Sequence, residues 1–132
     1  MSRQPKFSII TITFNAASVI EPTLQSVLSQ TYKNYEYLLI DGASKDDTVA
    51  KAKASGIKFA HIVSEPDKGL YDAMNKGICM ATGDVVGILN SDDYFASDYI
   101  LEKINENIKN YDAVYGDVNF INGDNPDVCV RY

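Results

Sequence analysis

The chain has 132 residues, of which 45% are hydrophobic and 23% charged, as in one ordinary globular domain. Its formal net charge is -6, and no run of Lys or Arg forms the basic stripe that nucleic acid requires, which argues against such a partner. The two cysteines, Cys79 and Cys129, lack the Cys-x-x-Cys or Cys/His spacing of zinc and redox sites.

Five short apolar runs, rich in β-branched residues and bounded by polar or turn-forming residues, predict strands. In chain order they are residues 7–13, 35–40, 57–63, 84–89 and 113–121. The expected helices run from a Ser18 cap to near Gln30, from Asp46-Asp47-Thr48 onward, from Leu70 to Met80 and from Tyr99 to Ile108. This alternation predicts one α/β domain over residues 1–132, with a mostly parallel sheet covered by helices on both faces.

Ligands of such sheets bind beyond the carboxyl ends of the strands. The residues at those ends are therefore the candidates for function: Phe14-Asn15, Asp41, residues 65–68 and residues 90–93. Three of these four ends carry carboxylates, and two unit charges ~4 Å apart repel by roughly 4 kcal/mol at an effective dielectric constant of about 20. That repulsion favours capture of a cation or a proton.

Two adjacent carboxylates, Asp92 and Asp93, follow the fourth expected strand directly. Mg²⁺ and Mn²⁺ commonly take one or two carboxylates and fill the remaining positions with water and phosphate oxygens. Asp also caps helices well, so the same residues could instead begin the next helix. The residues alone give the two interpretations equal weight.

Four stretches, taken together in their order and spacing, resemble family 2 glycosyltransferases over nearly all of the chain. They are residues 8–15, 39–46, 65–77, and 81–84 leading to 90–93. The resemblance implies a Rossmann-like GT-A domain, of which this chain would be the nucleotide-sugar-binding half. We therefore expect a C-terminally truncated piece that lacks the acceptor-binding half.

The same resemblance makes Asn90-Ser91-Asp92 the DXD-like motif of the family. Asp92 and Asp93 would then bind Mn²⁺ or Mg²⁺ on the diphosphate of the donor. Asn90 replaces the first Asp often found there, and it would hydrogen bond the donor sugar or a phosphate.

The other stretches imply contacts with the nucleotide. Phe14 would offer its ring face to the base, flanked by polar contacts from Thr13 and Asn15, although a core aromatic is the alternative. Asp41 matches the first acid of the family's Asp-Asp-Gly-Ser segment, which contacts the base, commonly uracil. Gly42 replaces the second acid, and Asp41 could instead form an Asx-turn.

Lys68 is the natural point charge near the diphosphate, unless it is a solvated surface lysine. Asn75 would lie on the polar helix face nearest the donor. His61, inside the third expected strand, is interpreted as a packed, hydrogen-bonded residue rather than a catalyst.

The implied reaction is an inverting transfer of a sugar from a nucleoside diphosphate sugar, most often a UDP-sugar, to a saccharide or lipid-linked acceptor, as in cell-surface polysaccharide synthesis. The family's general base lies further downstream, so no catalytic residue is assigned here, Asp117 included. We expect this chain to bind the donor without completing the transfer.

The apolar stretch from Phe7 is interrupted by Thr and Asn, which argues against a signal peptide or a membrane span. We therefore expect a cytoplasmic protein, and by family analogy one that acts at the inner face of a membrane.

Two other functions stay open, a receiver-like Mg²⁺-binding signalling domain and a non-catalytic nucleotide-binding module. The receiver-like alternative conflicts with the first strand end, which has no acidic pair.

Overall fold

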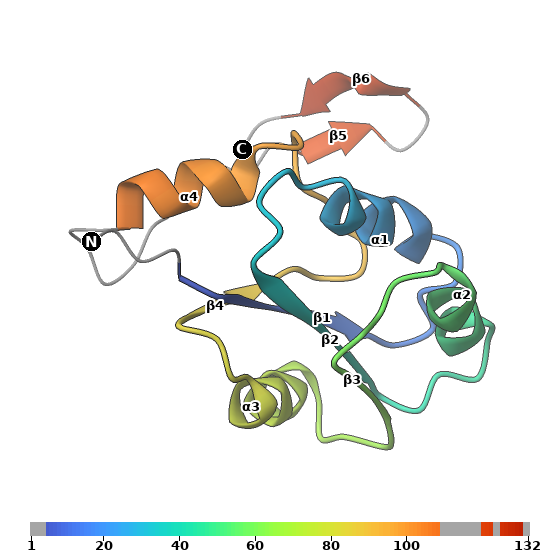
Figure 1. The fold of residues 1–132 in the computed structure, drawn as a ribbon. Coiled ribbons are helices and arrows are strands. Elements are labelled where there is room, and N and C mark those ends of the chain that lie inside the picture. The colour runs from blue at the N-terminus through green and yellow to red at the C-terminus, as the bar shows by residue number, and fades with distance from the viewer. Residues whose placement is uncertain (1–4, 109–119, 123–124, 131–132) are drawn as a thin grey trace.

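The computed structural model describes residues 5–108, 120–122 and 125–130. At its centre is a parallel sheet of four strands in the order β3-β2-β1-β4 (Figure 1). The strands are β1 (Phe7–Thr13), β2 (Tyr35–Asp41), β3 (His61–Ser64) and β4 (Val85–Ile88). The helices are α1 (Ile20–Leu28), α2 (Thr48–Ala54), α3 (Leu70–Met80) and α4 (Ile100–Ile108).

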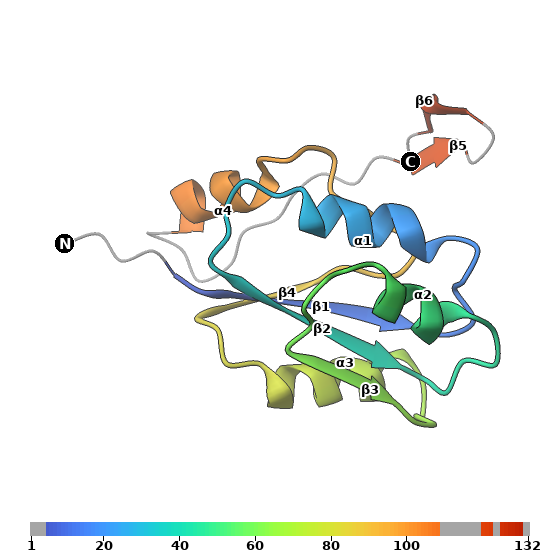
Figure 2. The same cartoon turned by 45° about the vertical axis from the view of Figure 1, so that its right-hand side comes forward.

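Helices cover both faces of the sheet, with α1, α2 and α4 on one side and α3 on the other (Figure 2). The central strands supply both cores because successive side chains point to opposite faces. Ile9 and Leu39 pack in the cluster that contains Leu24 of α1, whereas Ile10 packs in the cluster that contains Ala73 of α3. This arrangement confirms the α/β fold expected from the sequence.

The strand register brings the ends of the three paired strands β1, β2 and β3 side by side. Thr13 at the end of β1 pairs with Asp41 at the end of β2, and Asp41 pairs with Ser64 at the end of β3. On the other side of β1, the backbone N–H of Leu89 donates to the carbonyl of Ile10 at 2.8 Å. The residues after each strand therefore reach one edge of the sheet, which we call the carboxyl edge.

Some expected boundaries were wrong. No side chain caps α1, and Val19 rather than Ser18 precedes it. β3 begins at His61 instead of Ile57, and the residues before it contact β2 differently, since the Phe59 ring packs on Tyr37 with 5.0 Å between centroids. Because β3 is an edge strand, His61 is exposed rather than packed.

A second sheet consists of the antiparallel hairpin β5 (Phe120–Asn122) and β6 (Asn125–Val130). The strand expected over residues 113–121 lies mostly outside the described residues. Residues 122–126 are rich in turn-forming residues and would be expected to form a loop, but β6 starts at Asn125, which pairs with Asn122. Within the part of the chain described here, no helix is long and apolar enough to cross a membrane.

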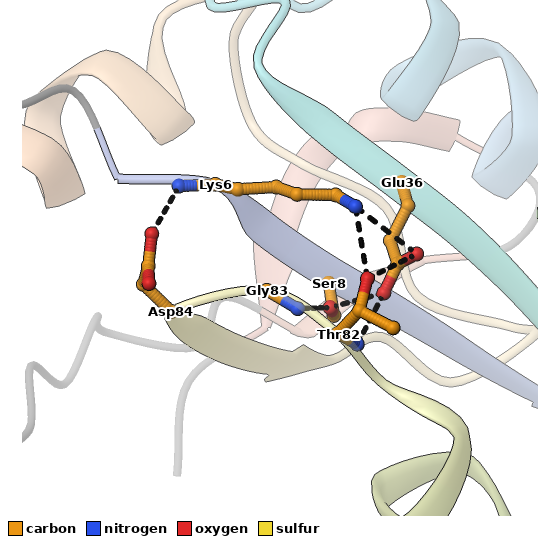
Figure 3. Close-up of polar contacts among 6 residues, drawn as sticks. All are labelled: Lys6, Ser8, Glu36, Thr82, Gly83 and Asp84. Carbon is orange, nitrogen blue, oxygen red and sulfur yellow. Dashed lines mark hydrogen bonds and ion pairs between the residues drawn. The ribbon is translucent and has the colours of Figure 1, made fainter.

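Polar side chains join the amino ends of β1, β2 and β4, at the end of the sheet opposite the carboxyl edge (Figure 3). We call them the amino-end cluster: Lys6, Ser8, Glu36, Thr82, Gly83 and Asp84. The carboxylate of Glu36 accepts hydrogen bonds from the Ser8 hydroxyl at 2.6 Å and the Thr82 N–H at 2.7 Å. It also lies 3.5 Å from the ammonium of Lys6.

These contacts favour the charged form of Glu36. Burial alone would raise its pKa, but the hydrogen bonds from Ser8 and Thr82 and the charge of Lys6 lower the pKa to about 2. The Ser8 hydroxyl in turn accepts a bond from the N–H of Gly83 at 2.8 Å. The cluster thus attaches the turn before β4 to the start of β1 and β2.

Candidate functional site

Asp41 lies at the centre of the carboxyl edge, and its own chain satisfies it completely. One carboxylate oxygen accepts the hydroxyls of Thr13, at 2.7 Å, and Ser44. The other accepts the N–H of Ser44 and the hydroxyl of Ser64, both at 2.8 Å. Burial would raise the pKa of Asp41, but these bonds lower it.

The alternative that Asp41 bonds a backbone amide of its own turn is present in the bond from the Ser44 N–H, which lies three residues on rather than the two of an Asx-turn. Asp41 and Thr13 are each 1% exposed. The Thr13 carbonyl accepts the Gly42 N–H at 3.0 Å, so both polar groups of Thr13 beyond its own N–H are used. A ligand could reach the Asp41 carboxylate only by displacing one of these bonds.

Phe14 and Asn15 leave the end of β1 toward solvent. Phe14 is 64% exposed, so the alternative of a core aromatic was wrong. Asn15 holds the neighbouring loop, since its side-chain oxygen accepts the Lys45 N–H at 2.8 Å. Asn15 and Ala43 have φ of 49° and 63°, which L-residues rarely adopt and which cluster at functional sites.

The loop after β3 leads into α3 and carries two of the expected residues. Lys68 is exposed, and its backbone N–H donates to Asp72 at 2.9 Å. Gly69, with φ of 115°, supplies the backbone conformation that starts α3. Asn75 lies exposed on α3. In the same loop, Asp67 accepts the Gly69 N–H at 3.0 Å.

Asp92 and Asp93 lie in a tight turn directly after β4. The Asp93 N–H donates to the Asn90 carbonyl at 3.0 Å, and both acidic residues are exposed. The alternative that they cap the next helix was wrong, because α4 begins only at Ile100. Burial and the charge of Asp92 raise the pKa of Asp93, against a lowering contribution from Asn90.

The donor set of this turn suits a hard divalent cation bound jointly with a ligand. Two adjacent carboxylates repel each other, and within the described residues neither forms an ion pair. Among all the residues that the structure describes, no group of three or more His, Cys, Asp or Glu side chains is close enough to hold a metal by itself. Asp92 and Asp93 therefore fit the mode in which one or two carboxylates share Mg²⁺ or Mn²⁺ with phosphate oxygens.

The sequence analysis missed the residues that hold this acidic turn. Buried polar side chains of α1 and of the residues just after it bond to the backbone between the end of β4 and the start of α4. The Thr23 hydroxyl contacts the carbonyls of Ser91, at 2.7 Å, and of Asp93. Further along, Gln30 donates to the Ser97 carbonyl at 2.7 Å and accepts the Leu101 N–H at 3.1 Å.

A signal for these residues was available. Thr23 and Gln30 are both 0% exposed. Thr23 lies on the face of α1 that also buries Leu24 and Val27, and Gln30 follows two residues after the helix ends. Buried polar side chains require hydrogen-bond partners, which a neighbouring loop can supply through its backbone. The sequence could have predicted that Thr23 and Gln30 are hydrogen bonded, although not to which segment.

Known glycosyltransferases are similar in sequence to this chain. Residues 8–128 match the family described as Glycosyl transferase family 2. The chain is 44% identical over 97 residues to an uncharacterized glycosyltransferase of Mycobacterium tuberculosis, covering 73% of this chain and 37% of that relative. It is 38% identical over 120 residues to a PGL/p-HBAD biosynthesis glycosyltransferase of Mycobacterium bovis, covering 86% of this chain and 47% of that relative.

Solved structures share the fold. A mannosyltransferase from Pyrobaculum calidifontis, in complex with GDP-Man and Mn²⁺, matches with a TM-score of 0.74 and 26% identity over 83% of this chain and 34% of its own. TarS 1–349 of S. aureus with UDP-GlcNAc matches with a TM-score of 0.72 and 25% identity, over 78% and 31%. The chain thus spans less than half the length of these relatives. The match to the glycosyltransferase family decides against the receiver-like signalling domain that the sequence left open.

Proposed function

The chain belongs to glycosyltransferase family 2, and on that premise we propose that its carboxyl edge binds a nucleoside diphosphate sugar through a divalent cation. The observation that carries this proposal is the pair of exposed, adjacent carboxylates of Asp92 and Asp93 on a turn fixed by α1. The exposed ring of Phe14 lies at the same edge of the sheet.

Asp92 and Asp93 would hold Mn²⁺ or Mg²⁺, and the bound ion would stabilise negative charge on the departing diphosphate. Asn90 and Asn75 are both exposed, and in this proposal their amides hydrogen bond the sugar or a phosphate. Lys68 is exposed in the loop before α3, and in this proposal its ammonium supports the anionic ligand as a point charge.

For the base, we propose that it lies against the ring of Phe14 and that uracil is the preferred base. In this arrangement, Asn15, Thr13 and Asp41 mainly support the loop next to Phe14 instead of contacting the base themselves. Asn15 fixes the loop through Lys45, while Thr13 and Asp41 bond to each other at 2.7 Å. Their network keeps two left-handed residues, Asn15 and Ala43, in place beside the ring.

Calorimetric titration of the 132-residue chain with UDP, with and without Mn²⁺, tests this proposal. Mn²⁺ should raise the UDP affinity by roughly 5- to 150-fold, the usual range for coupled ligands. Asp92→Ala and Asp93→Ala should remove that gain. Asp47→Ala is the matched control, because Asp47 is an exposed acid that makes no side-chain cap bond. Undiminished, metal-independent binding in both site variants would refute the proposed site.

For the whole protein, we extend the proposal to transfer onto a saccharide or lipid-linked acceptor at the cytoplasmic face of a membrane. The base that deprotonates the acceptor is then supplied by residues outside this chain. Transfer or release of sugar by the full-length protein supports this extension. Donor binding without any turnover would favour a non-catalytic nucleotide-binding module instead.

A further inference from the structure

A side chain at Gly42 would meet the carboxylate of Asp67. The φ of Gly42 is not left-handed, so backbone conformation does not require glycine there. A Cβ at residue 42 would lie 2.9 Å from Oδ2 of Asp67 and 3.4 Å from Cδ1 of Phe14. The carboxylate of Asp67 therefore fills the space into which a side chain at residue 42 would point.

The carboxylate of Asp67 is held in place from one side and open on the other. Its Oδ1 accepts the N–H of Gly69 at 3.0 Å, which fixes the side chain within its own loop. Its Oδ2, the atom over Gly42, accepts no hydrogen bond from the described residues. Asp67 is only half-buried, so this oxygen can still accept a bond from a ligand.

The neighbouring acid, Asp41, has no carboxylate oxygen open to a ligand in the same way. All four hydrogen bonds to Asp41 come from its own chain, and the residue is 1% exposed. The sequence resembles a segment with two consecutive acids, of which only Asp41 is present. A carboxylate nevertheless lies above residue 42, where the second acid would be, and it comes from the loop after β3.

We propose that Asp67 takes the place of the missing second acid and determines which base the donor carries, by accepting a ring N–H from a base that lies against Phe14. This inference rests on the proposed function. A carboxylate oxygen accepts the N3–H of uracil or thymine, or the N1–H of guanine. Cytosine presents a lone pair at N3, which a carboxylate repels. Sites that hydrogen bond an N–H reject analogues that lack it.

The test is titration of the 132-residue chain with UDP, GDP and CDP, each with Mn²⁺. The wild type should bind UDP or GDP at least about tenfold more tightly than CDP, the discrimination expected of one hydrogen bond to a charged group. Asp67→Ala should lose most of this preference. Asp67→Asn retains an oxygen for the Gly69 N–H and gains an amide that can donate to cytosine, so it should narrow or reverse the preference.

Two further variants separate base recognition from a structural effect. Glu65→Gln alters a neighbouring carboxylate that lies 3.1 Å from Lys76, and it should leave the base preference unchanged. Gly42→Asp combined with Asp67→Ala moves the carboxylate to residue 42 and should restore the preference for UDP or GDP. Gly42→Asp alone should weaken binding of all three nucleotides, because its side chain would overlap Asp67.

The outcomes distinguish this inference from the function on which it rests. If the wild type binds none of the three nucleotides, the proposed function fails and the inference fails with it. If the wild type binds UDP with Mn²⁺, and Asp67→Ala keeps the same affinity and the same ratio to CDP, only the role of Asp67 is refuted. Equal wild-type affinity for CDP, UDP and GDP would refute that role as well.

Discussion

Carboxylates lie at both ends of the sheet, but they are hydrogen bonded within the protein at one end and exposed at the other. At the amino end, Glu36 receives bonds from Ser8 and Thr82 and lies beside Lys6, which lowers its pKa to about 2. At the carboxyl edge, Asp92 and Asp93 are exposed and adjacent, and the pKa of Asp93 is raised. Satisfied acids hold this fold together, and acids left short of donors are the candidates for ligand binding.

The contrast also sorts the acids within the carboxyl edge. Asp41 resembles Glu36, because its own chain supplies every hydrogen bond that it accepts and its pKa is lowered. Asp67 resembles the exposed pair, since one of its oxygens is open. Four substitutions, taken from the largest expected effect to the smallest, test this division.

Gly83→Ala should have the largest effect on stability. A Cβ at this residue would lie 2.6 Å from the Lys6 carbonyl and 2.6 Å from the Ser8 hydroxyl, and the backbone of β1 cannot move away easily. Overpacking of this kind costs about 3 kcal/mol of unfolding free energy, measurable by urea denaturation. Gly87→Ala is the control, because its Cβ would meet only Ile9 at an ordinary 3.6 Å. Equal losses in both variants would show that the amino-end cluster imposes no special packing.

Glu36→Gln should cost about 2 kcal/mol at neutral pH, since it removes the charge from several hydrogen bonds. The lowered pKa fixes the pH dependence. The stabilising contribution is complete above the ordinary pKa of 4.5 and is lost as the pH falls toward about 2. The difference in unfolding free energy between wild type and variant should therefore shrink across that window.

The matched control for Glu36 is Glu21→Gln. The side chain of Glu21 is 68% exposed, and its ion pair with Lys51 spans 3.6 Å. Exposed pairs of this kind contribute about 0–1 kcal/mol, so this variant should stay close to wild type at every pH. A difference for Glu36→Gln that does not change between neutral and acidic pH would contradict the assignment of a charged, satisfied Glu36.

Thr23→Val removes the hydroxyl that holds the acidic turn while keeping the shape of the side chain. We expect a loss of about 1 kcal/mol in stability, the usual value of one neutral hydrogen bond. Mn²⁺-dependent UDP affinity should fall, because the turn with Asp93 loses its bond to α1. UDP affinity without metal should stay the same, and Thr23→Ser should restore the metal effect. A parallel fall in both affinities would indicate a general loss of structure.

Asp93→Asn should have the smallest effect on stability and the opposite sign. A raised pKa means that the charged form of Asp93 is disfavoured in the folded state, so its charge costs stability once the pH rises through the folded pKa. Removing the charge should stabilise the chain by less than about 1 kcal/mol at neutral pH, the scale of exposed charge interactions. Thermal unfolding without metal measures this, and a clear destabilisation would contradict it.

Local patterns in the sequence predicted most of the fold. β1 and α3 have the expected bounds, because a continuous β-branched run and an uninterrupted helical pattern depend little on their neighbours. The start of β3 could not be read in this way, since strand length depends on the partner, and β2 pairs with β3 only from Leu38 onward. The hairpin left a signal, because two residues separate the paired Asn122 and Asn125.

The candidate site was predictable to the level of strand ends but not of individual contacts. The rule that ligands bind beyond the strands selected Phe14, Asp41 and the acidic turn. It could not show that Asp41 is saturated or that Phe14 is exposed, because both depend on residues from other loops. The contact between Asp67 and Gly42 also joins loops distant in sequence, and only the folded arrangement reveals it.

One measurement tests the central claim most directly, namely the shift in thermal unfolding produced by Mn²⁺ with UDP. Ligand at about 100 times its dissociation constant stabilises a protein by about 2.7 kcal/mol. Wild type and Glu36→Gln should gain the same increment, and the double variant Asp92→Asn with Asp93→Asn should gain none. An equal shift in all three would show that the exposed acids after β4 do not bind the metal that carries the donor.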